Sequence, residues 1–335
     1  YSWSIFETEE GIQGSLQSRF SERRNPLSVF INAQYEMNNH AILEAGVSLN
    51  TLSYSLTDKS NSTNDLSGDY RYPMILSPFL GVNMPISDAI HLYSSLSHGF
   101  SAPSVEETLL PEGNINPDLK PETGVNLELG MRYKSVNDRI FLDAGIYTIW
   151  VSNLLVTKRE TEDVFYGDNA GKTRYSGFEF SSRFHMNNKN SSYPISLSMN
   201  YNLIHAMFTD FVDDGQDFTN HILPGIPIQN IWSSVNIYSY FGAFVEIQYQ
   251  FVGKQYLNDA NDKSYGSYQL MHLKLGYSLS LNSAKIDFSA GLRNIFDTHY
   301  ASMVLVNAPS FGGSLPRYYY PGMPRNYFFS LGMRF

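Results

Sequence analysis

From about Val125 onward, the chain repeats one pattern, in which apolar side chains alternate with polar or small ones until a turn follows. The pattern returns over 195–203, 245–251 and 286–292, and the chain ends on a further alternating segment. A soluble sheet also alternates, because it buries one face and wets the other. Many strands of roughly ten residues, rich in Tyr and Phe, are however what a transmembrane β-barrel requires. The sequence therefore predicts an all-β, antiparallel transmembrane β-barrel of an outer membrane.

Composition excludes several other classes of protein. Aromatic residues make up 15% of the chain and charged residues 16%, and the mean hydropathy is −0.26, as expected if only alternate positions face lipid. No run of about eighteen apolar residues is present, which excludes helical membrane spans. The chain has no Cys, which excludes disulfides, thiolate nucleophiles and Cys metal sites. A net charge of −9 argues against a nucleic-acid partner.

We expect about fourteen strands, each roughly ten residues long. They span 1–8, 27–36, 41–54, 70–83, 89–99, 124–134, 139–156, 173–186, 193–209, 226–239, 242–256, 267–281, 284–295 and 325–335. Short turns alternate with long connections, which run over 55–69, 100–123, 157–172, 210–225, 257–266 and 296–324. In bacterial barrels the short turns are periplasmic and the long loops extracellular. All of the long loops should therefore lie at one end of the sheet.

The alternation also assigns faces to the side chains. The residues expected to face lipid are Leu127, Leu129, Met131, Leu197, Met199, Val245, Ile247, Ile286 and Phe288. Lys274, Lys285, Asp287 and Arg293 fall on the opposite positions, where charge must meet water or protein.

The ends of such a sheet also need an explanation. Its two edges would leave backbone groups unpaired, at a cost of several kcal/mol each in hydrocarbon. Either the strands close into a smaller barrel or further strands complete the ring. Tyr1 opens inside an expected strand without a signal peptide, so we expect a mature fragment that lacks an N-terminal part.

Several segments carry short motifs in a fixed order. They are Gly99–Glu107 (GFSAPSVEE), Asn116–Thr123 (NPDLKPET) followed by Asn126–Gly130 (NLELG), Tyr166–Gly171 (YGDNAG) followed by Tyr175–Glu179 (YSGFE), Leu223–Pro227 (LPGIP), Gly291–Asp297 (GLRNIFD) with Tyr300, and Pro321–Phe335. Together they resemble the C-terminal barrel of the TonB-dependent outer-membrane receptors, which import iron–siderophores, haem, cobalamin and some glycans. Gly99 and Ser101 depart from the family's usual Ser and Arg. Within these segments, Glu122 and Glu128 are expected to pair with Lys120 or Arg132.

The resemblance implies a ring of about 22 strands around an N-terminal plug. The whole chain, 1–335, would be the C-terminal portion of that barrel, with about eight strands, the plug and the energy-coupling box outside it. By the same resemblance, the alternating last strand would be the signal that the barrel-assembly machinery reads, carried by Leu331, Met333 and Phe335. The protein would lie among the lipids of the outer membrane of a Gram-negative bacterium.

The long loops hold the candidate ligand-binding residues. These are Phe311, Arg317, Tyr318, Tyr319 and Tyr320 in the last loop, Phe211 and His221 in loop 210–225, and Tyr166 in loop 157–172. Aromatic rings and Arg suit an anionic, aromatic-rich iron chelate through stacking, cation–π contact and charge. A rim girdle is the alternative for each tyrosine. Asp213, Asp214 and Asp217 invite Ca²⁺ but lack the EF-hand spacing, and His221 or His299 offers a haem alternative.

The function that best fits is an outer-membrane receptor that binds a scarce metal chelate, a ferric siderophore above all. It would import that chelate with energy from the TonB complex, which it would reach through the N-terminal part outside this chain. A passive porin and a surface adhesin or phage-docking barrel are the alternatives. We expect no enzyme, because no Ser-His-Asp arrangement or nucleophile elbow is visible. No resident metal and no cofactor are expected either.

Overall fold

The computed structural model describes all of the chain except residues 1, 10, 11, 60–64, 66, 105, 106, 109–115, 117, 162, 163, 170, 188–190, 214, 282, 283, 309, 311–314 and 335. The side chains of 2–9, 12, 13, 15–18, 157–161 and 164–166 are also outside the description. The elements in the described part are all strands, and no helix there is long and apolar enough to cross a membrane.

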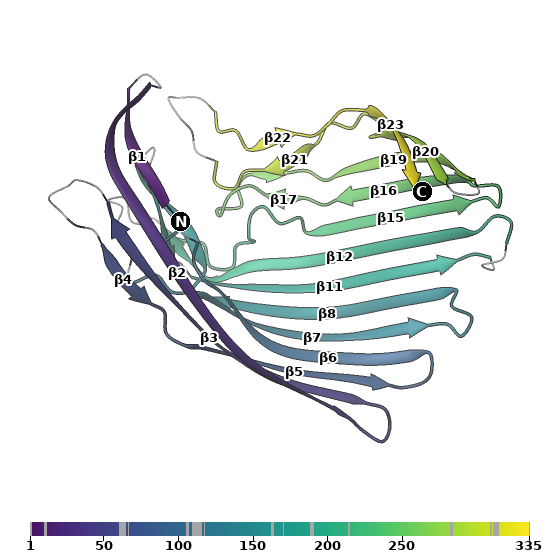
Figure 1. The fold of residues 1–335 in the computed structure, drawn as a ribbon, viewed down its shortest axis with the longest axis horizontal. Coiled ribbons are helices and arrows are strands. Elements are labelled where there is room, and N and C mark those ends of the chain that lie inside the picture. The colour runs from purple at the N-terminus through teal and green to yellow at the C-terminus, as the bar shows by residue number, and fades with distance from the viewer. Residues whose placement is uncertain are drawn as a thin grey trace.

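One antiparallel sheet contains most of the chain (Figure 1). Its strands, in spatial order, are β1 (Ser2–Glu9), β2 (Ile12–Glu36), β3 (Ile42–Asp58), β5 (Ile75–Pro85), β6 (Ile90–Ser101), β7 (Glu122–Lys134), β8 (Ile140–Ser152), β11 (Lys172–His185), β12 (Ile195–Asp210), β15 (Gln229–Tyr238), β16 (Ala243–Val252), β19 (Tyr268–Ser280), β20 (Lys285–Arg293) and β23 (Asn326–Arg334). The short β4 (Gly68–Arg71) pairs with β3 beside this path. Each strand of the path neighbours the next along the chain, which confirms the predicted fold class and strand order.

Two of the predicted strands differ most from those in the structure. β2 begins at Ile12 rather than at residue 27, because 12–26 also pairs with its neighbours although it lacks an apolar face. The strand expected over 70–83 is divided into β4 and β5, with Tyr72–Met74 between them. Pro73 has no N–H to donate to a ladder, so a break in pairing falls there.

The predicted lipid-facing residues do lie on a single face of the sheet. Leu197 is opposite Val235, Val235 is opposite Ile247, and Ile247 is opposite Leu273. The intervening row is polar and runs from Ser198 through Ser234 and Gln248 to His272. Residues directly opposite each other in a ladder share a face, so these rows define an apolar face and a polar face.

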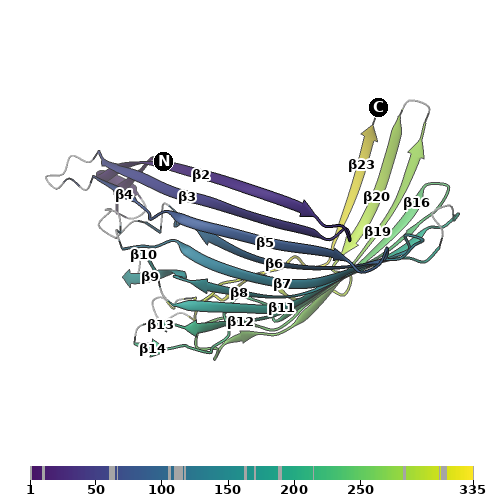
Figure 2. The same cartoon turned by 90° about the horizontal axis from the view of Figure 1, so that it is seen from below.

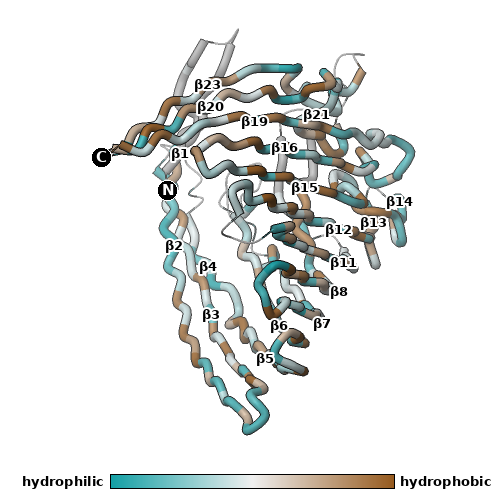
Figure 3. The backbone as a smooth tube through the Cα atoms, turned by 90° about the vertical axis from the view of Figure 1, so that its right-hand side faces the viewer, coloured by the Kyte–Doolittle hydropathy of each residue, from teal (hydrophilic) through white to brown (hydrophobic). Residues whose placement is uncertain are grey.

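The apolar face has no protein packed over it in the described part of the chain. Leu129 and Ile146, which are paired on β7 and β8, are 52% and 55% exposed. Figure 3 shows hydrophobic and hydrophilic residues alternating along the strands. Exposed apolar rows of this extent need an apolar solvent, and lipid supplies one.

The sheet is curved but not closed (Figures 1 and 2). Among the described residues, β1 covers only the Ile12–Ser21 part of β2, and β23 pairs with β20 alone. The edges of the sheet are therefore β1 with the rest of β2 on one side and β23 on the other. Unpaired N–H and C=O groups are costly in hydrocarbon, so this arrangement requires further strands to complete a wall.

Several glycines on the polar face lie beneath aromatic rings of the neighbouring strand. Gly130 lies opposite Tyr93, Gly177 opposite Tyr147, Gly276 opposite Phe244, and Gly291 opposite Phe328. A Cβ added at any of these glycines would overlap the facing ring. The missing side chain thus lets each ring lie flat over the neighbouring backbone, which stabilises a strongly curved sheet.

The Tyr93–Gly130 pair gives a test of this packing. We predict that Gly130→Ala in the complete receptor lowers the free energy of unfolding by about 1 kcal/mol, the size of a cross-strand aromatic contact. The Tyr93 ring has little freedom to move away, because its hydroxyl donates to Asp143 at 2.9 Å and the Arg132 guanidinium lies 4.7 Å from its centroid.

Urea unfolding of the receptor in lipid vesicles measures the difference. Gly99→Ala is the matched control, because a Cβ there meets nothing within 4 Å. Equal stabilities of the Gly130→Ala and Gly99→Ala variants would show that the packing of the Tyr93 ring does not require a glycine at position 130.

Candidate functional site

The long connections lie at one end of the sheet and fold into small hairpins. These are β9 (Leu155–Thr161) with β10 (Val164–Asn169), β13 (Val212–Asp213) with β14 (Gln216–Asp217), β17 (Gln255–Tyr256) with β18 (Ser264–Tyr265), and β21 (Ala301–Val304) with β22 (Tyr319–Pro321). Figures 1 and 2 show them at the end opposite the short turns. This end, which we call the loop rim, is therefore a folded surface.

Three of the loops in the rim are joined by hydrogen bonds. Asn261 donates from its side-chain amide to the Ile222 carbonyl at 2.8 Å and accepts from the Ile222 amide at 2.7 Å. Asn307 donates to the Asp259 carboxylate at 2.7 Å and accepts from the Asp259 amide at 3.1 Å. The predicted site residue His221 places its Nδ1 2.8 Å from the Asp259 carbonyl. Loops 210–225, 257–266 and 296–324 thus form one connected body.

Asp259 is the charged residue at the centre of these contacts. Burial raises the pKa of its carboxyl group, and the Asn307 amide opposes that shift only in part. Raising the pKa means that burial favours the protonated form. The contribution of Asp259 to loop stability is therefore complete below the pKa of the unfolded chain and is lost as the pH rises through the folded value.

Tyrosines gather beside the last hairpin. The Tyr319 ring lies 5.5 Å from Tyr265, which lies 6.2 Å from Tyr268, and Tyr268 lies 5.1 Å from Tyr300. Tyr265 also accepts a hydrogen bond from the Ala301 amide at 2.8 Å. Tyr319 is 56% exposed, so one end of this tyrosine cluster is open to a ligand while the other is held by the scaffold.

The remaining predicted residues of the last loop have different positions. Arg317 is exposed in the connection that enters β22. Tyr318 is half-buried, and its carbonyl accepts from the Leu305 amide at 2.6 Å. Tyr320 is exposed and pairs with Met303. Phe311 lies outside the described residues. These residues share one loop, and Arg317, Tyr319 and Tyr320 face solvent.

The other two candidate residues, Phe211 and Tyr166, lie in loops 210–225 and 157–172. Phe211 is 3% exposed and stacks on Phe208 with centroids 4.3 Å apart, so it packs inside the rim. Ala206 and Leu223 complete that hydrophobic cluster, on which the rim loops rest. Tyr166 pairs through its backbone with Lys158, while its side chain is outside the description.

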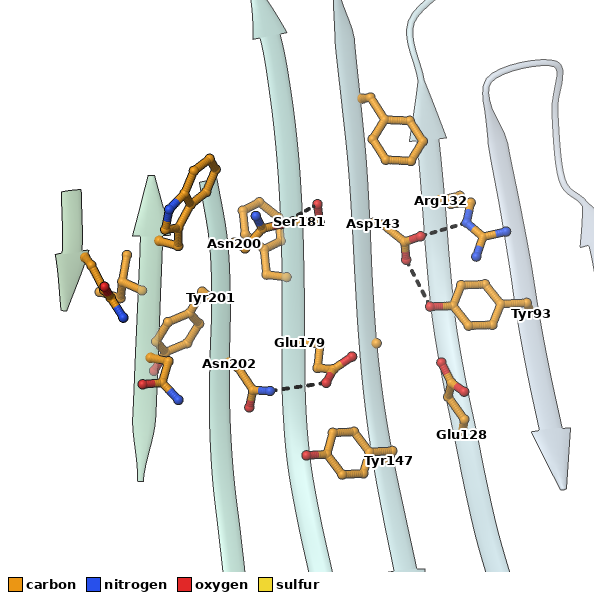
Figure 4. A pocket seen from close by; sticks show the side chains of 17 residues that line it. Tyr93, Glu128, Arg132, Asp143, Tyr147, Glu179, Ser181, Asn200, Tyr201 and Asn202 are labelled. Carbon is orange, nitrogen blue, oxygen red and sulfur yellow. Dashed lines mark hydrogen bonds and ion pairs between the residues drawn. The ribbon is translucent and has the colours of Figure 1, made fainter. Parts of the chain in front are cut away.

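A hollow of about 530 Å³ lies on the polar face below the rim (Figure 4). Arg132 donates from Nε to Asp143 at 2.7 Å, and Tyr93 donates to the other oxygen of that carboxylate. Asn202 donates to Glu179 at 3.2 Å. Glu128, Tyr147, Tyr201, Trp232 and Gln250 also line the hollow. Its carboxylates outnumber its single arginine, so it suits a polar or cationic neighbour.

The charged groups expected to form ion pairs around Arg132 and Lys120 have other partners in the structure. Arg132 binds Asp143 on the next strand instead of Glu122 or Glu128. Glu122 accepts a hydrogen bond from the Leu155 amide at 2.7 Å, and the Lys120 amide donates to Asn169 at 2.6 Å. The C-terminal end of loop 100–123 is therefore tied to neighbouring strands and loops rather than held by an ion pair between Lys120 and Glu122.

Sequence reasoning missed a buried charged pair at the same end of the sheet. Glu22, which is 2% exposed, bonds Arg24, and Arg24 donates to the Pro103 carbonyl at 2.6 Å and to the Thr108 hydroxyl at 3.2 Å. Its guanidinium also lies 5.3 Å from the Tyr54 ring centroid. Arg24 thus holds the APS segment of loop 100–123 against β2 and β3. No local sequence signal marks such a long-range contact.

Metal ligation has little support in the rim. No group of three or more His, Cys, Asp or Glu within the described residues is placed to hold a metal ion. Asp217 accepts instead from the Thr219 amide at 2.9 Å, and the Thr219 hydrogen bonds hold the pKa of its carboxyl below the usual range. Asp214 lies outside the described residues.

Comparison with known proteins identifies the family. The family model described as "TonB dependent receptor-like, beta-barrel" matches residues 6–295. The ferrioxamine receptor of Yersinia enterocolitica is 21% identical over 88% of this chain and 38% of its own length. The vitamin B12 transporter BtuB of Vibrio vulnificus is 25% identical over 76% of this chain and 37% of its own. The unliganded ferric citrate transporter FecA superposes with a TM-score of 0.74 at 17% identity, over 96% of this chain and 46% of that one.

The chain therefore belongs to the TonB-dependent receptor β-barrel family, and the resemblance seen in its motifs is confirmed. The family consists of transport receptors rather than enzymes, and its members are β-barrels of the Gram-negative outer membrane. The chain spans less than half the length of the curated relatives that it matches.

Proposed function

We propose that the complete protein is an active-transport receptor that binds a ferric siderophore at the loop rim and imports it with TonB-coupled energy. This chain would supply the C-terminal wall and the rim. The N-terminal part outside it would supply the plug and the contact with TonB. The observation that carries the proposal is the juxtaposition, in one loop, of exposed Arg317, Tyr319 and Tyr320 with the tyrosine cluster.

The chemistry of these groups suits a ferric chelate. Many such chelates are anionic and present flat, conjugated groups. A guanidinium supplies charge and directional donors, while tyrosine rings supply flat contact area at low entropic cost. The hydrogen bonds through Asn307 and Tyr265 fix the hairpin that carries the rings, so little ordering remains to oppose binding. The ferrioxamine receptor among the relatives supports a ferric siderophore as the ligand.

The polar face supports the transport half of the proposal. A wall lined by carboxylates, amides and hydroxyls can contact a hydrated plug or a passing polar solute, whereas a wall of apolar residues could not. The hollow around Asp143 offers such groups in the middle of β6–β16. A substrate bound at the rim would therefore meet a hydrophilic route on the inner side of the wall.

A double substitution tests the ligand-binding residues. We predict that Arg317→Ala with Tyr319→Ala weakens binding of the cognate ferric chelate by about 1–3 kcal/mol, the sum of one charge-assisted contact and one aromatic contact. The probes are radioiron-labelled ferrioxamine and ferric citrate, with labelled cyanocobalamin as a metal complex of another class. Cell-surface binding to the complete receptor gives the affinities.

The control replaces the same residue types at the short-turn end of the sheet, with Arg139→Ala and Tyr240→Ala. Unchanged affinity in the Arg317 and Tyr319 variant would contradict the assignment. Uptake that persists after the proton gradient is collapsed would favour a passive porin. Binding of every probe at background level would favour an adhesin or docking barrel.

We further propose that the last strand is the segment that the barrel-assembly machinery reads. β23 lies at an edge of the sheet, and Leu331 and Met333 project from its apolar face opposite Phe288 and Ile286. Phe335 follows this strand and lies outside the described residues. An alternating edge strand with an aromatic end gives a partner a backbone ladder and a side-chain anchor together.

Phe335→Asp should therefore reduce the yield of folded receptor in the membrane severalfold, while leaving the affinity of assembled molecules unchanged. The measurement is the heat-modifiable fraction on unheated gels. Phe329→Asp, an equally drastic change on the same strand, separates a terminal signal from a general loss of lipid-facing surface. A normal folded fraction with Phe335→Asp would contradict the proposal.

A further inference from the structure

The inner side of the last strands carries more positive than negative charge. Hollows of about 430 and 580 Å³ lie on the polar face of β16, β19, β20 and β23, and both are lined by Glu246 and Lys274. The hollow around Asp143 has the opposite balance, with three carboxylates and one arginine. The described polar face therefore has an acidic sector and a basic sector. The cations that line the two hollows of the basic sector, which we call the basic track, are Lys274, Lys285, Arg293 and Arg334.

Aromatic rings hold two of these cations in place. The Arg293 guanidinium lies 4.8 Å from the centroid of the Phe328 ring, and the Lys274 Nζ lies 5.6 Å from that of Phe244. Each ring lies over a glycine of the neighbouring strand. A ring attracts a cation without neutralising its charge. Neither cation forms an ion pair with a carboxylate of the described residues, so both can still donate to an anion.

The carboxylates that line the same hollows are already engaged. Glu246 accepts a hydrogen bond from the Gln248 side-chain amide at 2.6 Å. Asp287 accepts from the Ser278 hydroxyl at 2.5 Å and from the Arg334 guanidinium at 2.9 Å. Two engaged carboxylates face four cations, so the basic sector keeps an excess of positive charge.

The basic track extends from the loop rim towards the short turns. Tyr268, a member of the tyrosine cluster, lies four residues before His272 on the polar face of β19. The Asn294 amide donates to Nδ1 of His272 at 3.1 Å, which leaves Nε2 of that ring as a donor in the upper hollow. Arg293 and Lys285 are the two ends of β20, about 27 Å apart along a strand. That distance is close to the thickness of the hydrocarbon core.

We propose that the basic track is the route along which an anionic ferric chelate passes the inner wall after it leaves the loop rim. The route depends on the proposed function, and it specifies the charge of the cargo and the side of the wall that the cargo follows. Cations along a narrow, water-filled space raise the local concentration of anions. Several binding positions of modest strength suit passage, because a solute must leave each position as well as enter it. The carboxylates of the acidic sector repel the same cargo.

Charged thiol reagents measure the potential of the track without any cargo. Ser289 lies midway along β20 and lines the lower hollow, and Ser289→Cys is introduced into the complete receptor with any Cys elsewhere replaced by Ser. In energised cells, sulfonatoethyl methanethiosulfonate should react there faster, relative to its trimethylammonioethyl analogue, than at Ser181→Cys in the acidic sector. Lys274→Gln with Arg293→Gln should lower the ratio of the two rates at position 289 about fivefold, because two cations are removed.

The matched control is Lys134→Gln with Arg183→Gln, which removes the same charge from one row of β7 and β11 on the polar face. It should leave the ratio at position 289 unchanged, and the heat-modifiable fraction confirms that every variant folds. Equal ratios at positions 289 and 181 would overturn the proposal, as would an equal effect of the control. Protection of Ser289→Cys from both reagents in energised cells would also overturn it.

Uptake of radioiron-labelled ferric citrate, an anionic chelate, separates passage from binding. Lys274→Gln with Arg293→Gln should slow uptake at saturation about fivefold while surface affinity stays unchanged, because the loop rim is intact. An unchanged uptake rate with a less stable plug would overturn the route and assign these cations to carboxylates of the plug. A wild-type receptor that binds no ferric chelate would contradict the proposed function, whereas the thiol reagents would still decide whether the track attracts anions.

Discussion

The backbone hydrogen bond in a medium without water is the constraint on which the rest of this structure depends. Every N–H and C=O in hydrocarbon needs a protein partner, so strands must pair along their whole length and in sequence order. Continuous pairing fixes the register, and the register fixes which side chains meet lipid. Leu197, Val235 and Ile247 lie in one row for this reason, as do Ser198, Ser234 and Gln248 in the next. At the edges formed by β2 and β23, backbone N–H and C=O groups have no neighbouring strand within the described part of this chain.

The order of the loop rim depends on the shape of the wall and on contacts between the loops. Glycines such as Gly130 and Gly291 allow rings to lie over the backbone, which gives a curved, fixed scaffold. The loops are then joined above it through Asn261 and Asn307, and by the hydrophobic cluster around Phe211. A rim built in this way presents Arg317 and Tyr319 from an ordered hairpin, which reduces the entropic cost of binding. The proposed ligand binding therefore depends on contacts between loops, which hold Arg317 and Tyr319 in place without touching the ligand themselves.

The strand order and the two faces could be predicted from period-two alternation alone, because lipid imposes it on every spanning strand. The N-terminal half of β2 could not, since Ile12–Pro26 extends beyond the apolar rows and shows no contrast between faces. Pro73 could have marked the break between β4 and β5. In the loops, Phe211 and Tyr319 look alike in sequence, yet one is buried and the other 56% exposed. Phe211 packs on Phe208 and Leu223 together with residues of other strands such as Tyr175. The Arg24–Pro103 contact joins positions 79 residues apart. Such packing carries no local signal.

The face assignment is the central claim, and because this chain contains no Cys, a single Cys introduced into it is a unique thiol within this part of the receptor. Single Cys substitutions at Val125, Asn126, Leu127, Glu128 and Leu129 in the complete receptor, each carrying a nitroxide label, would be reconstituted in lipid vesicles. Collision rates with oxygen and with a water-soluble nickel chelate report lipid and water. The structure predicts high oxygen access at Val125, Leu127 and Leu129, and low oxygen access at the two residues between them. Uniform access along β7, or nickel access highest at Leu127 and Leu129, would contradict a wall whose apolar rows face lipid.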